Sequence, residues 1–270
     1  MSNAASLRHV ASRDNPLFKR LRALASSAQA RRKEGLSVLD GAHLVEAALA
    51  ATWQPELLAV SESGMKRAEI TRLVAASPVP ATCFPDALFE AFSTVEHGAG
   101  IVAALATPRV VLPRAIESDC LLLEHLQDPG NMGSLLRSAA AAGVRWVICS
   151  EATVYAWSPK VLRAAQGAHF ALSIVEGVSL DEAVARMTVP VIATELRAGT
   201  SLFDCDLRGP VAWLFGNEGA GLSDQALRLA HRRVCIPMPG QAESLNVAAA
   251  GAVCLFEAVR QRRAAAGEKR

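Results

Sequence analysis

Apolar residues near the N-terminus recur at the three- and four-residue spacing of one helix face. The pattern starts after Asp14 and Asn15, either of which suits a helix cap, and Pro16 suits the first helical position. Gly35 is a suitable end, because glycine tolerates the left-handed conformation that often closes a helix. We therefore predict a helical segment between Asn15 and Gly35, with a buried face that carries Leu17, Leu21 and Leu24.

Short apolar runs then alternate with helical patterns as far as Ala106, which predicts a small α/β unit. The stretch 107–116 contains Pro108 and Pro113, so it is predicted to be a linker that follows a first domain, residues 1–106. We expect strands at residues 36–39, 57–60, 79–84 and 100–105, and helices at residues 42–50, 65–76 and 86–92.

A longer alternation of the same kind starts at Cys120 and predicts a second α/β domain, residues 117–270. Its sheet should be mostly parallel, with helices on both faces, and such sheets bind ligands beyond the carboxyl ends of their strands. The final helix is expected to start near Leu245. We expect strands at residues 120–124, 146–149, 171–175, 189–193, 211–215 and 234–236.

The composition excludes several classes of protein. No run approaches the roughly 18 apolar residues of a membrane span, and the N-terminus has no signal-peptide pattern, so we expect a cytoplasmic protein without a membrane partner. The six cysteines are scattered singly, which predicts buried thiols. The six histidines lack the spacing of metal ligands, so we expect no metal.

Basic residues gather at the two ends of a chain whose net charge is only +2. The first 33 residues hold eight lysines and arginines but one acid, Asp14. Clustered cations can bind phosphates, yet a solvated helix face gives the same pattern, and charge alone leaves both readings open. The basic residues are Arg8, Arg13, Lys19, Arg20, Arg22, Arg31, Arg32 and Lys33, and at the other end Arg260, Arg262, Arg263, Lys269 and Arg270.

Three polar loops follow predicted strands, at residues 127–144 (QDPGNMGSLLRSAAAAGV), 215–223 (FGNEGAGLS) and 236–253 (IPMPGQAESLNVAAAGAV). Their glycines permit close backbone approach, and Asn131, Asn217 and Asn246 each offer hydrogen-bond donors and acceptors. Together the loops predict a polar pocket at the strand ends.

Two further features place candidate side chains at this pocket. Arg137 lies six residues after Asn131, so we expect it early on the following helix, from where it can reach back over the loop. Ser244 and Asn246 are expected at the start of the last helix, where free N–H groups favour a polar or anionic ligand.

Common nucleotide and hydrolase motifs are absent from the sequence. There is no G-x-x-x-x-G-K-[ST] and no G-x-S-x-G. Gly216, Gly219 and Gly221 have the spacing G-x-x-G-x-G, which differs from the dinucleotide-binding pattern G-x-G-x-x-G. A dinucleotide-dependent enzyme is therefore a weak alternative.

The three loops resemble the three motifs of the SpoU/TrmH-type RNA 2′-O-ribose methyltransferases, in order and at the expected spacing. The matching residues are N-x-G-x-x-x-R at Asn131–Arg137, G-N-E-G at Gly216–Gly219, and I-P-M at Ile236–Met238 followed by S-L-N-V at Ser244–Val247. The segment Ser158–Phe170 is similar to a further family segment.

The N-terminal part looks more loosely like the family's substrate-binding domain. Its R-x-x-E-G…G-x-H run lies at Arg31–His43, and Asp40 stands before Gly41 where the family more often has glutamate.

The resemblance implies a SPOUT α/β domain with a C-terminal trefoil knot, S-adenosyl-L-methionine (SAM) as cofactor, an RNA substrate and a homodimer. Carried over by position, Gly216, Ile236 and Leu245 would contact SAM through their backbone, and Leu196 would lie near the adenine. Asn217, Glu218 and Met238 complete the expected cofactor site, where Glu218 would support the pocket or the dimer interface.

The resemblance also implies a catalytic set of Arg137, Asn131, Ser244 and Asn246. Because an ordinary guanidinium stays protonated, we expect Arg137 to hold a substrate phosphate and stabilise developing negative charge rather than act as the base. Asn131, Ser244 and Asn246 would orient the ribose and Arg137. Taken singly, Asn131 and Asn217 could be turn residues, Arg137 a surface helix residue and Ser244 a helix cap.

Three readings of function remain in order of preference. A methyltransferase acting on ribosomal RNA is favoured because of the N-terminal domain, and transfer RNA is the alternative substrate. The second reading is an RNA-binding protein that has lost catalysis, which SAM binding without methyl transfer would identify. The third is the dinucleotide-dependent enzyme.

Overall fold

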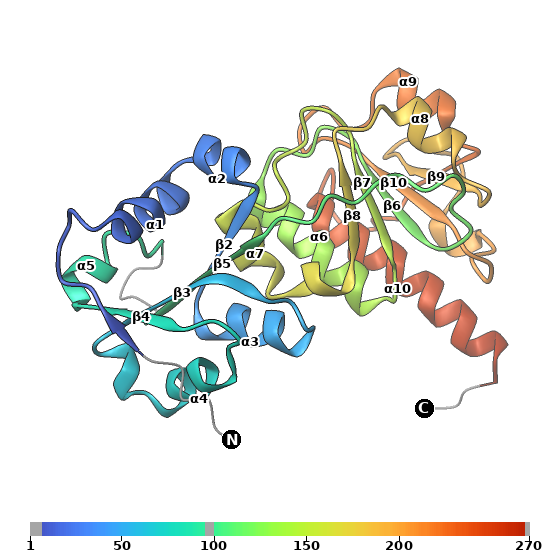
Figure 1. The fold of residues 1–270 in the computed structure, drawn as a ribbon. Helices are drawn as coiled ribbons and strands as arrows, with labels where there is room; N and C mark the ends of the chain where they lie inside the picture. The colour runs from blue at the N-terminus through green and yellow to red at the C-terminus, as the bar shows by residue number, and fades with distance from the viewer. Residues whose placement is uncertain (1–6, 95–99, 268–270) are drawn as a thin grey trace. The chain divides into compact units, whose positions relative to one another are not determined.

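The computed structural model describes residues 7–94 and 100–267 (Figure 1). The chain forms two compact units. The N-terminal unit comprises the chain up to Pro108 together with Trp157–Phe170, and the C-terminal unit comprises Arg109–Ala156 and Ala171 onward. The segment Trp157–Phe170 therefore packs with the N-terminal unit, although its sequence resembles a catalytic-domain segment.

A five-stranded mixed sheet forms the centre of the N-terminal unit, with strand order β1-β4-β3-β5-β2. β4 runs parallel to β1 and β3, whereas β5 runs antiparallel to β3 and β2. The strands are β1 (Arg8–His9), β2 (Leu36–Asp40), β3 (Pro55–Ser61), β4 (Ala81–Phe84) and β5 (Ile101–Ala106). The helices are α1 (Pro16–Ser26), α2 (Ala28–Glu34), α3 (Ala42–Ala50), α4 (Ala68–Ala76), α5 (Asp86–Phe89) and α7 (Pro159–Ala165), with the short 3₁₀ turns η1 (Gly64–Lys66) and η2 (Ala168–Ala171).

The first helical segment is broken at Ser27, which the sequence pattern did not predict. Ser27 has an extended backbone, and its side chain accepts a hydrogen bond from Ala30 N–H to cap α2. Arg31 then folds back and donates to the carbonyls of Leu24 and Ala25 at the end of α1. Gly35 ends α2 with a φ of 66°, in the left-handed conformation expected there.

The buried face of α1 is centred on Phe18, Leu21 and Leu24, and Leu17 is only partly buried. Leu17 packs against this core from its edge, while Phe18, which the spacing did not single out, lies in an aromatic cluster. Phe18 lies 6.1 Å from Phe92 between ring centroids, and Phe84 lies 5.2 Å from Phe92. This cluster joins α1 to the sheet of the N-terminal unit.

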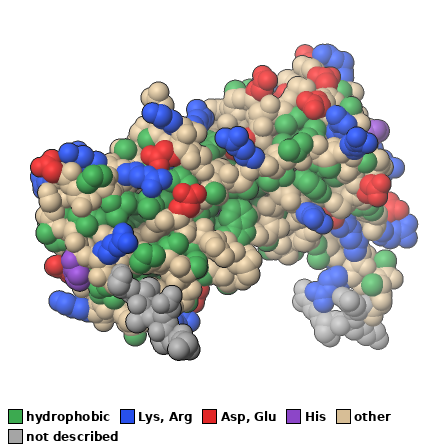
Figure 2. Space-filling model, in the orientation of Figure 1, with side chains coloured by type: hydrophobic (Ala, Val, Ile, Leu, Met, Phe, Trp, Pro, Cys, Tyr) green, Lys and Arg blue, Asp and Glu red, His purple; other side chains and the backbone are tan. Residues whose placement is uncertain are grey.

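Part of the predicted basic cluster is structural. Arg31 is buried by its bonds to α1, Lys19 pairs with Asp14 at 3.0 Å, and Arg20 pairs with Glu34 at 2.6 Å. At the other end of the chain, Arg260 pairs with Glu257, and Arg262 pairs with Asp119. Lys269 and Arg270 lie outside the described residues. On the face drawn in Figure 2, basic and acidic side chains are intermixed.

Six parallel strands form the sheet of the C-terminal unit, in the order β11-β9-β10-β6-β7-β8. The strands are β6 (Cys120–Leu123), β7 (Trp146–Cys149), β8 (Ser173–Glu176), β9 (Val191–Thr194), β10 (Ala212–Phe215) and β11 (Arg232–Val234). The helices are α6 (Pro129–Ala141), α8 (Leu180–Ala185), α9 (Asp224–Leu229) and α10 (Val247–Ala265), with the 3₁₀ turn η3 (Leu202–Asp204).

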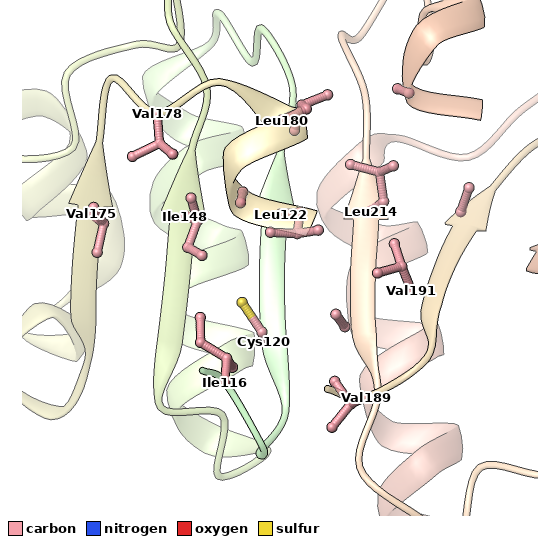
Figure 3. Packing of buried hydrophobic residues seen from close by; sticks show 14 residues of the cluster. Ile116, Cys120, Leu122, Ile148, Val175, Val178, Leu180, Val189, Val191 and Leu214 are labelled. Carbon is pink, nitrogen blue, oxygen red and sulfur yellow. The ribbon is translucent and has the colours of Figure 1, made fainter. Parts of the chain in front are cut away.

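Both faces of this sheet are buried. Alternate residues of the strands, among them Cys120, Leu122 and Leu214, pack with α8 and α9 in one cluster (Figure 3). On the other side α6 packs against α10 (Figure 1), and the helices approach closely because Gly251 has no side chain. A Cβ at Gly251 would lie 2.3 Å from Leu135 Cδ2. Among the described residues, no helix combines the length and apolar character needed to cross a membrane.

The strand order creates a switch point between β6 and β10. The chain adds β7 and β8 on one side of β6, then crosses over and builds β9, β10 and β11 on the other side. Connections after β6 and β10 therefore leave the sheet in divergent directions, and a crevice forms at their carboxyl ends. The three loops predicted from the sequence follow β6, β10 and β11.

Candidate active site

A cavity of about 200 Å³ lies at the carboxyl ends of β9, β10 and β11 and the start of α10. Every residue predicted to bind the cofactor lines this cavity, and so does Ser244. The predicted residues on the wall are Leu196, Gly216, Asn217, Glu218, Ile236, Met238 and Leu245; the wall also includes Thr194, Glu195, Phe215, Gly219, Gly221, Leu222, Val234, Cys235, Val247 and Ala250.

Gly216 is the point at which the loop after β10 passes closest to itself. A Cβ at this position would lie 2.3 Å from the backbone of Gly221 and 2.5 Å from Leu222 N. Asn217 and Gly221 exchange backbone hydrogen bonds of 3.0 and 2.9 Å, which close the turn. Only glycine fits the first position of this turn.

Asn217 fixes the loop with its side chain. Its Oδ1 accepts hydrogen bonds from the N–H groups of Gly219 and Ala220, at 2.9 and 3.0 Å. Its Nδ2 donates to the carbonyl of His125, just after β6, at 2.9 Å. Asn217 therefore holds the turn in shape and ties it to the neighbouring strand end.

The Glu218 carboxylate joins the loop after β10 to the beginning of α6. It accepts hydrogen bonds from Gln127 N–H (3.1 Å), Asp128 N–H (2.9 Å) and Asn131 Nδ2 (3.1 Å). Burial raises the pKa of Glu218, but these hydrogen bonds to the ionised form outweigh it, so the pKa lies below its usual value. The carboxylate is thus held in its charged form.

Asn131 and Asn246 continue this network to the third loop. Asn246 Nδ2 donates to Asn131 Oδ1 at 2.8 Å, while Asn246 Oδ1 caps α10 by accepting from Ala248 N–H. The chain of hydrogen bonds Glu218–Asn131–Asn246 links all three loops. Each predicted asparagine therefore connects two segments.

Two predicted catalytic residues lie differently from the expectation. α6 already begins at Pro129, so Arg137 is in its third turn rather than early on it. Six residues along a helix place it about 9 Å along the axis and about 120° around it from Asn131. Arg137 is exposed, lies off the cavity wall, and makes no hydrogen bond or ion pair within the described residues.

Ser244 also differs from its predicted place. α10 starts at Val247, and Asn246 is its cap, so Ser244 lies in the extended segment before the helix. It is exposed there and lines the cavity. β11 likewise ends at Val234, two residues before its predicted end, which leaves Ile236 in that same extended segment.

Glu124 is a further structural residue of the site, outside the three motifs. Its buried carboxylate accepts from Ser223 N–H (2.8 Å) and Ser223 Oγ (2.6 Å), and Ser223 Oγ in turn caps α9 at Ala226 N–H. The loop after β10 is therefore held at one end by Glu124 and within by Glu218. An acidic residue directly after an apolar strand was the available signal.

The cavity offers groups that suit a ligand with polar and apolar parts. Leu196 and Leu245 are 62% and 40% exposed, which is unusual for leucine. Gly216 is buried, yet its N–H donates to no described residue, and the same holds for the N–H groups of Ile236 and Leu245. Backbone donors without a protein partner on a cavity wall are available to a polar ligand.

Comparison with known proteins identifies the family. The model of the SpoU rRNA methylase family matches residues 119–256, and that of the MRM3-like substrate binding domain matches residues 15–103. The chain belongs to the SpoU rRNA methylase family. The resemblance seen in the three motifs is thereby confirmed.

Relatives of this SpoU family member agree along most of its length. An uncharacterized tRNA/rRNA methyltransferase of Synechocystis is 36% identical over 95% of both chains. The 23S rRNA (guanosine(2553)-2′-O)-methyltransferase RlmP of Bacillus subtilis is 32% identical over 84% of this chain and 89% of the relative. The solved SpoU methyltransferase AviRb of Streptomyces viridochromogenes, in complex with AdoMet, is 28% identical with a TM-score of 0.83, over 92% of this chain and 98% of that one.

Proposed function

We propose that the cavity binds SAM and that the chain methylates a ribose 2′-hydroxyl of 23S ribosomal RNA. The general reaction follows from the family: the protein is a SAM-dependent RNA ribose 2′-O-methyltransferase. The observation that carries the assignment of the site is the Glu218–Asn131–Asn246 network, which joins the first family motif to the two motifs whose residues line the cavity.

The residues on the wall fit SAM by their chemistry. Leu196 and Leu245 offer apolar surface to an adenine ring, and the free N–H groups of Gly216, Ile236 and Leu245 offer donors to the polar groups of the molecule. Asn217 and Glu218 keep the wall in shape, and Met238 adds a flexible apolar side chain. When bound, SAM supplies an activated methyl group.

The chain's own residues handle the RNA. The 2′-hydroxyl must lose a proton as it attacks, so its position and the charge that develops on it both matter. Arg137 is exposed and makes no ion pair within the described residues, which leaves its guanidinium available to an RNA phosphate. Asn131 is fixed by Glu218 and Asn246, so it can orient the ribose, and Ser244 contributes a hydroxyl from the cavity wall.

Further features of the family are proposed for this chain. The segment from β11 through Asn246 into α10 would form the trefoil knot. Residues 1–106 would form the RNA-binding domain and residues 117–270 the catalytic domain, with residues 107–116 as the linker between them. Trp157–Phe170 belongs to the catalytic domain by sequence but packs with the N-terminal unit. We propose a cytoplasmic homodimer. The exposed apolar side chains of Phe203 (52%) and Phe256 (47%) support a surface on the C-terminal unit that the second subunit would cover.

Ribosomal RNA is preferred over transfer RNA because relatives such as RlmP are named as 23S rRNA enzymes. The test incubates the protein with methyl-labelled SAM and total RNA from its own cell type lacking this gene, and maps the label to one nucleotide and atom. We expect label on a 2′-oxygen of 23S RNA, lost with Arg137→Ala. Label in transfer RNA would overturn the substrate, and label on a base would overturn the proposed position.

A further inference from the structure

The N-terminal unit contains a second cavity, which none of the three motifs reaches. It has a volume of about 550 Å³, within the usual range of ligand sites, and lies between α3, the turn before β3, and α4. All its lining residues fall within the part of the chain that matches a substrate-binding domain. We propose that this cavity holds one unpaired nucleobase of the RNA substrate.

The wall of the cavity contains a firmly held tryptophan. Trp53 stacks on Trp157 with a centroid distance of 5.7 Å and an interplanar angle of 23°, and meets Phe170 edge-on at 5.3 Å. The backbone N–H of Trp53 donates to the carbonyl of Ala48 at 2.9 Å. Trp53 is partly exposed and lines the cavity. A fixed aromatic wall is the usual partner of an unstacked base.

The turn that presents Trp53 has a strained backbone. Thr52, also on the wall, has a φ of 63°, and a β-branched side chain rarely adopts this left-handed conformation. Such conformations persist where the surrounding structure enforces them, and they gather at binding sites. Thr52 directly precedes Trp53, which packs against Trp157 and Phe170.

The charges on the wall favour a neutral ring over a phosphate. The charged residues among the lining are Arg72 of α4 and Glu46 of α3, and they pair with each other at 2.6 Å. The lining is therefore neutral overall and largely apolar. Yet Arg72, Glu46 and the exposed amide of Gln54 provide donors and acceptors of the kind that read base edges. An apolar side chain of a protein partner would leave these groups unused.

The inference rests on the proposed function only in that the substrate is RNA.

The test fills the cavity from its rim with Ala76→Phe in the full chain, because Ala76 is exposed on α4 and lines the cavity. Ala75→Phe is the matched control, since Ala75 is the preceding exposed residue of α4 and lies off the wall. The measurements are KM for total RNA lacking the modification, kcat at saturating RNA, and Kd for SAM.

We expect Ala76→Phe to raise KM for RNA at least about tenfold, which corresponds to losing the binding free energy of one stacked base. We expect kcat and Kd for SAM to stay within about twofold. Ala75→Phe should change none of the three. Gln54→Ala, which removes only an exposed amide, should raise KM for RNA about threefold and guards against a folding defect in the first variant.

An unchanged KM for RNA in both Ala76→Phe and Gln54→Ala, with an active wild type, would overturn the nucleobase site and leave the methyltransferase standing. An equal rise of KM in Ala75→Phe would also overturn it, because the effect would then belong to the helix surface. A wild type that transfers no methyl group to any RNA would instead overturn the proposed function.

Discussion

The two cavities of this protein are built by different means. In the C-terminal unit, hydrogen bonds among Glu218, Asn131 and Asn246 tie together three loops, two of which line a cavity at the strand ends. In the N-terminal unit, aromatic packing of Trp53 and a strained turn shape a larger cavity. A hydrogen-bond network fixes the orientation of the loops and so favours one cofactor geometry. An aromatic wall binds a planar ring by stacking, which depends less on the direction of individual bonds. We therefore expect changes in the first to affect chemistry and SAM, and changes in the second to affect RNA binding alone.

The largest effect is expected from Arg137→Ala. Removing a cation that stabilises developing charge should lower kcat/KM about 10²- to 10³-fold, with Kd for SAM unchanged because Arg137 lies off the cavity wall. Methyl transfer from labelled SAM to RNA measures the rate, and calorimetry measures SAM binding. Arg145→Ala, another exposed arginine of the same unit, is the control and should retain full activity. Full activity of Arg137→Ala would contradict the assignment.

Gly216→Ala should come next, through SAM binding. Its Cβ would meet the backbone of Gly221 at 2.3 Å, so the loop must shift, and overpacking of this kind costs about 1–3 kcal/mol. We expect Kd for SAM to rise at least about tenfold, measured by calorimetry. Gly219→Ala in the same loop is the matched control. The added Cβ would lie 3.6 Å from Asn217 Oδ1, which is an ordinary van der Waals contact. Similar Kd values for the two variants would contradict the steric argument.

Glu218 should give the C-terminal unit a pH dependence that the other cavity lacks. Because its pKa is lowered from 4.5 in the folded protein, its stabilising contribution is present above the unfolded pKa and is lost as pH falls through the folded value. Protonation of Glu218 at acid pH removes these hydrogen bonds from the loop, so SAM affinity should weaken as pH falls through its lowered pKa in the wild type. Glu218→Gln should bind SAM a few-fold more weakly at pH 7 and show a flatter profile. Parallel profiles of the two proteins would contradict this role.

The smallest effect is expected from Thr52→Gly. Glycine adopts a positive φ without the steric conflict of a β-branched side chain, so the variant should be more stable by up to about 1 kcal/mol. Thermal unfolding should show a rise of a few degrees, and Kd for SAM should not change. A loss of stability would show that the threonine side chain contributes more packing than its backbone conformation costs.

The sequence located the elements of both units well where their patterns were local. The helix at residues 42–50 and the strand at residues 146–149 have the predicted bounds. Departures occurred where tertiary contacts overrode local preference. Ser27 broke the first helix because Arg31 caps its end, and Phe18 replaced Leu17 in the core because aromatic partners from β4 and the segment after α5 lie beside it.

The site shows the same division. Seven cofactor-site residues were named from the family resemblance, six of them within the motifs, and the structure places all seven on one cavity wall. The roles of the side chains were less visible: Arg137 is in the third turn of α6, Ser244 precedes the helix it was expected to start, and Glu124 holds the loop after β10. The first two differences follow from where α6 and α10 start, which depends on the capping residues Asp128 and Asn246.

The sequence by itself determined the family, the order of elements and the residue types that meet at the strand ends, because these depend on periodicity and on motifs with fixed spacing. Only the tertiary structure decided that Trp157–Phe170 packs with the N-terminal unit and that Trp53 lines a cavity there. Contacts between residues 100 positions apart leave no periodic trace in a single sequence. Their positions follow from how strands and helices pack, and packing is fixed by the whole fold.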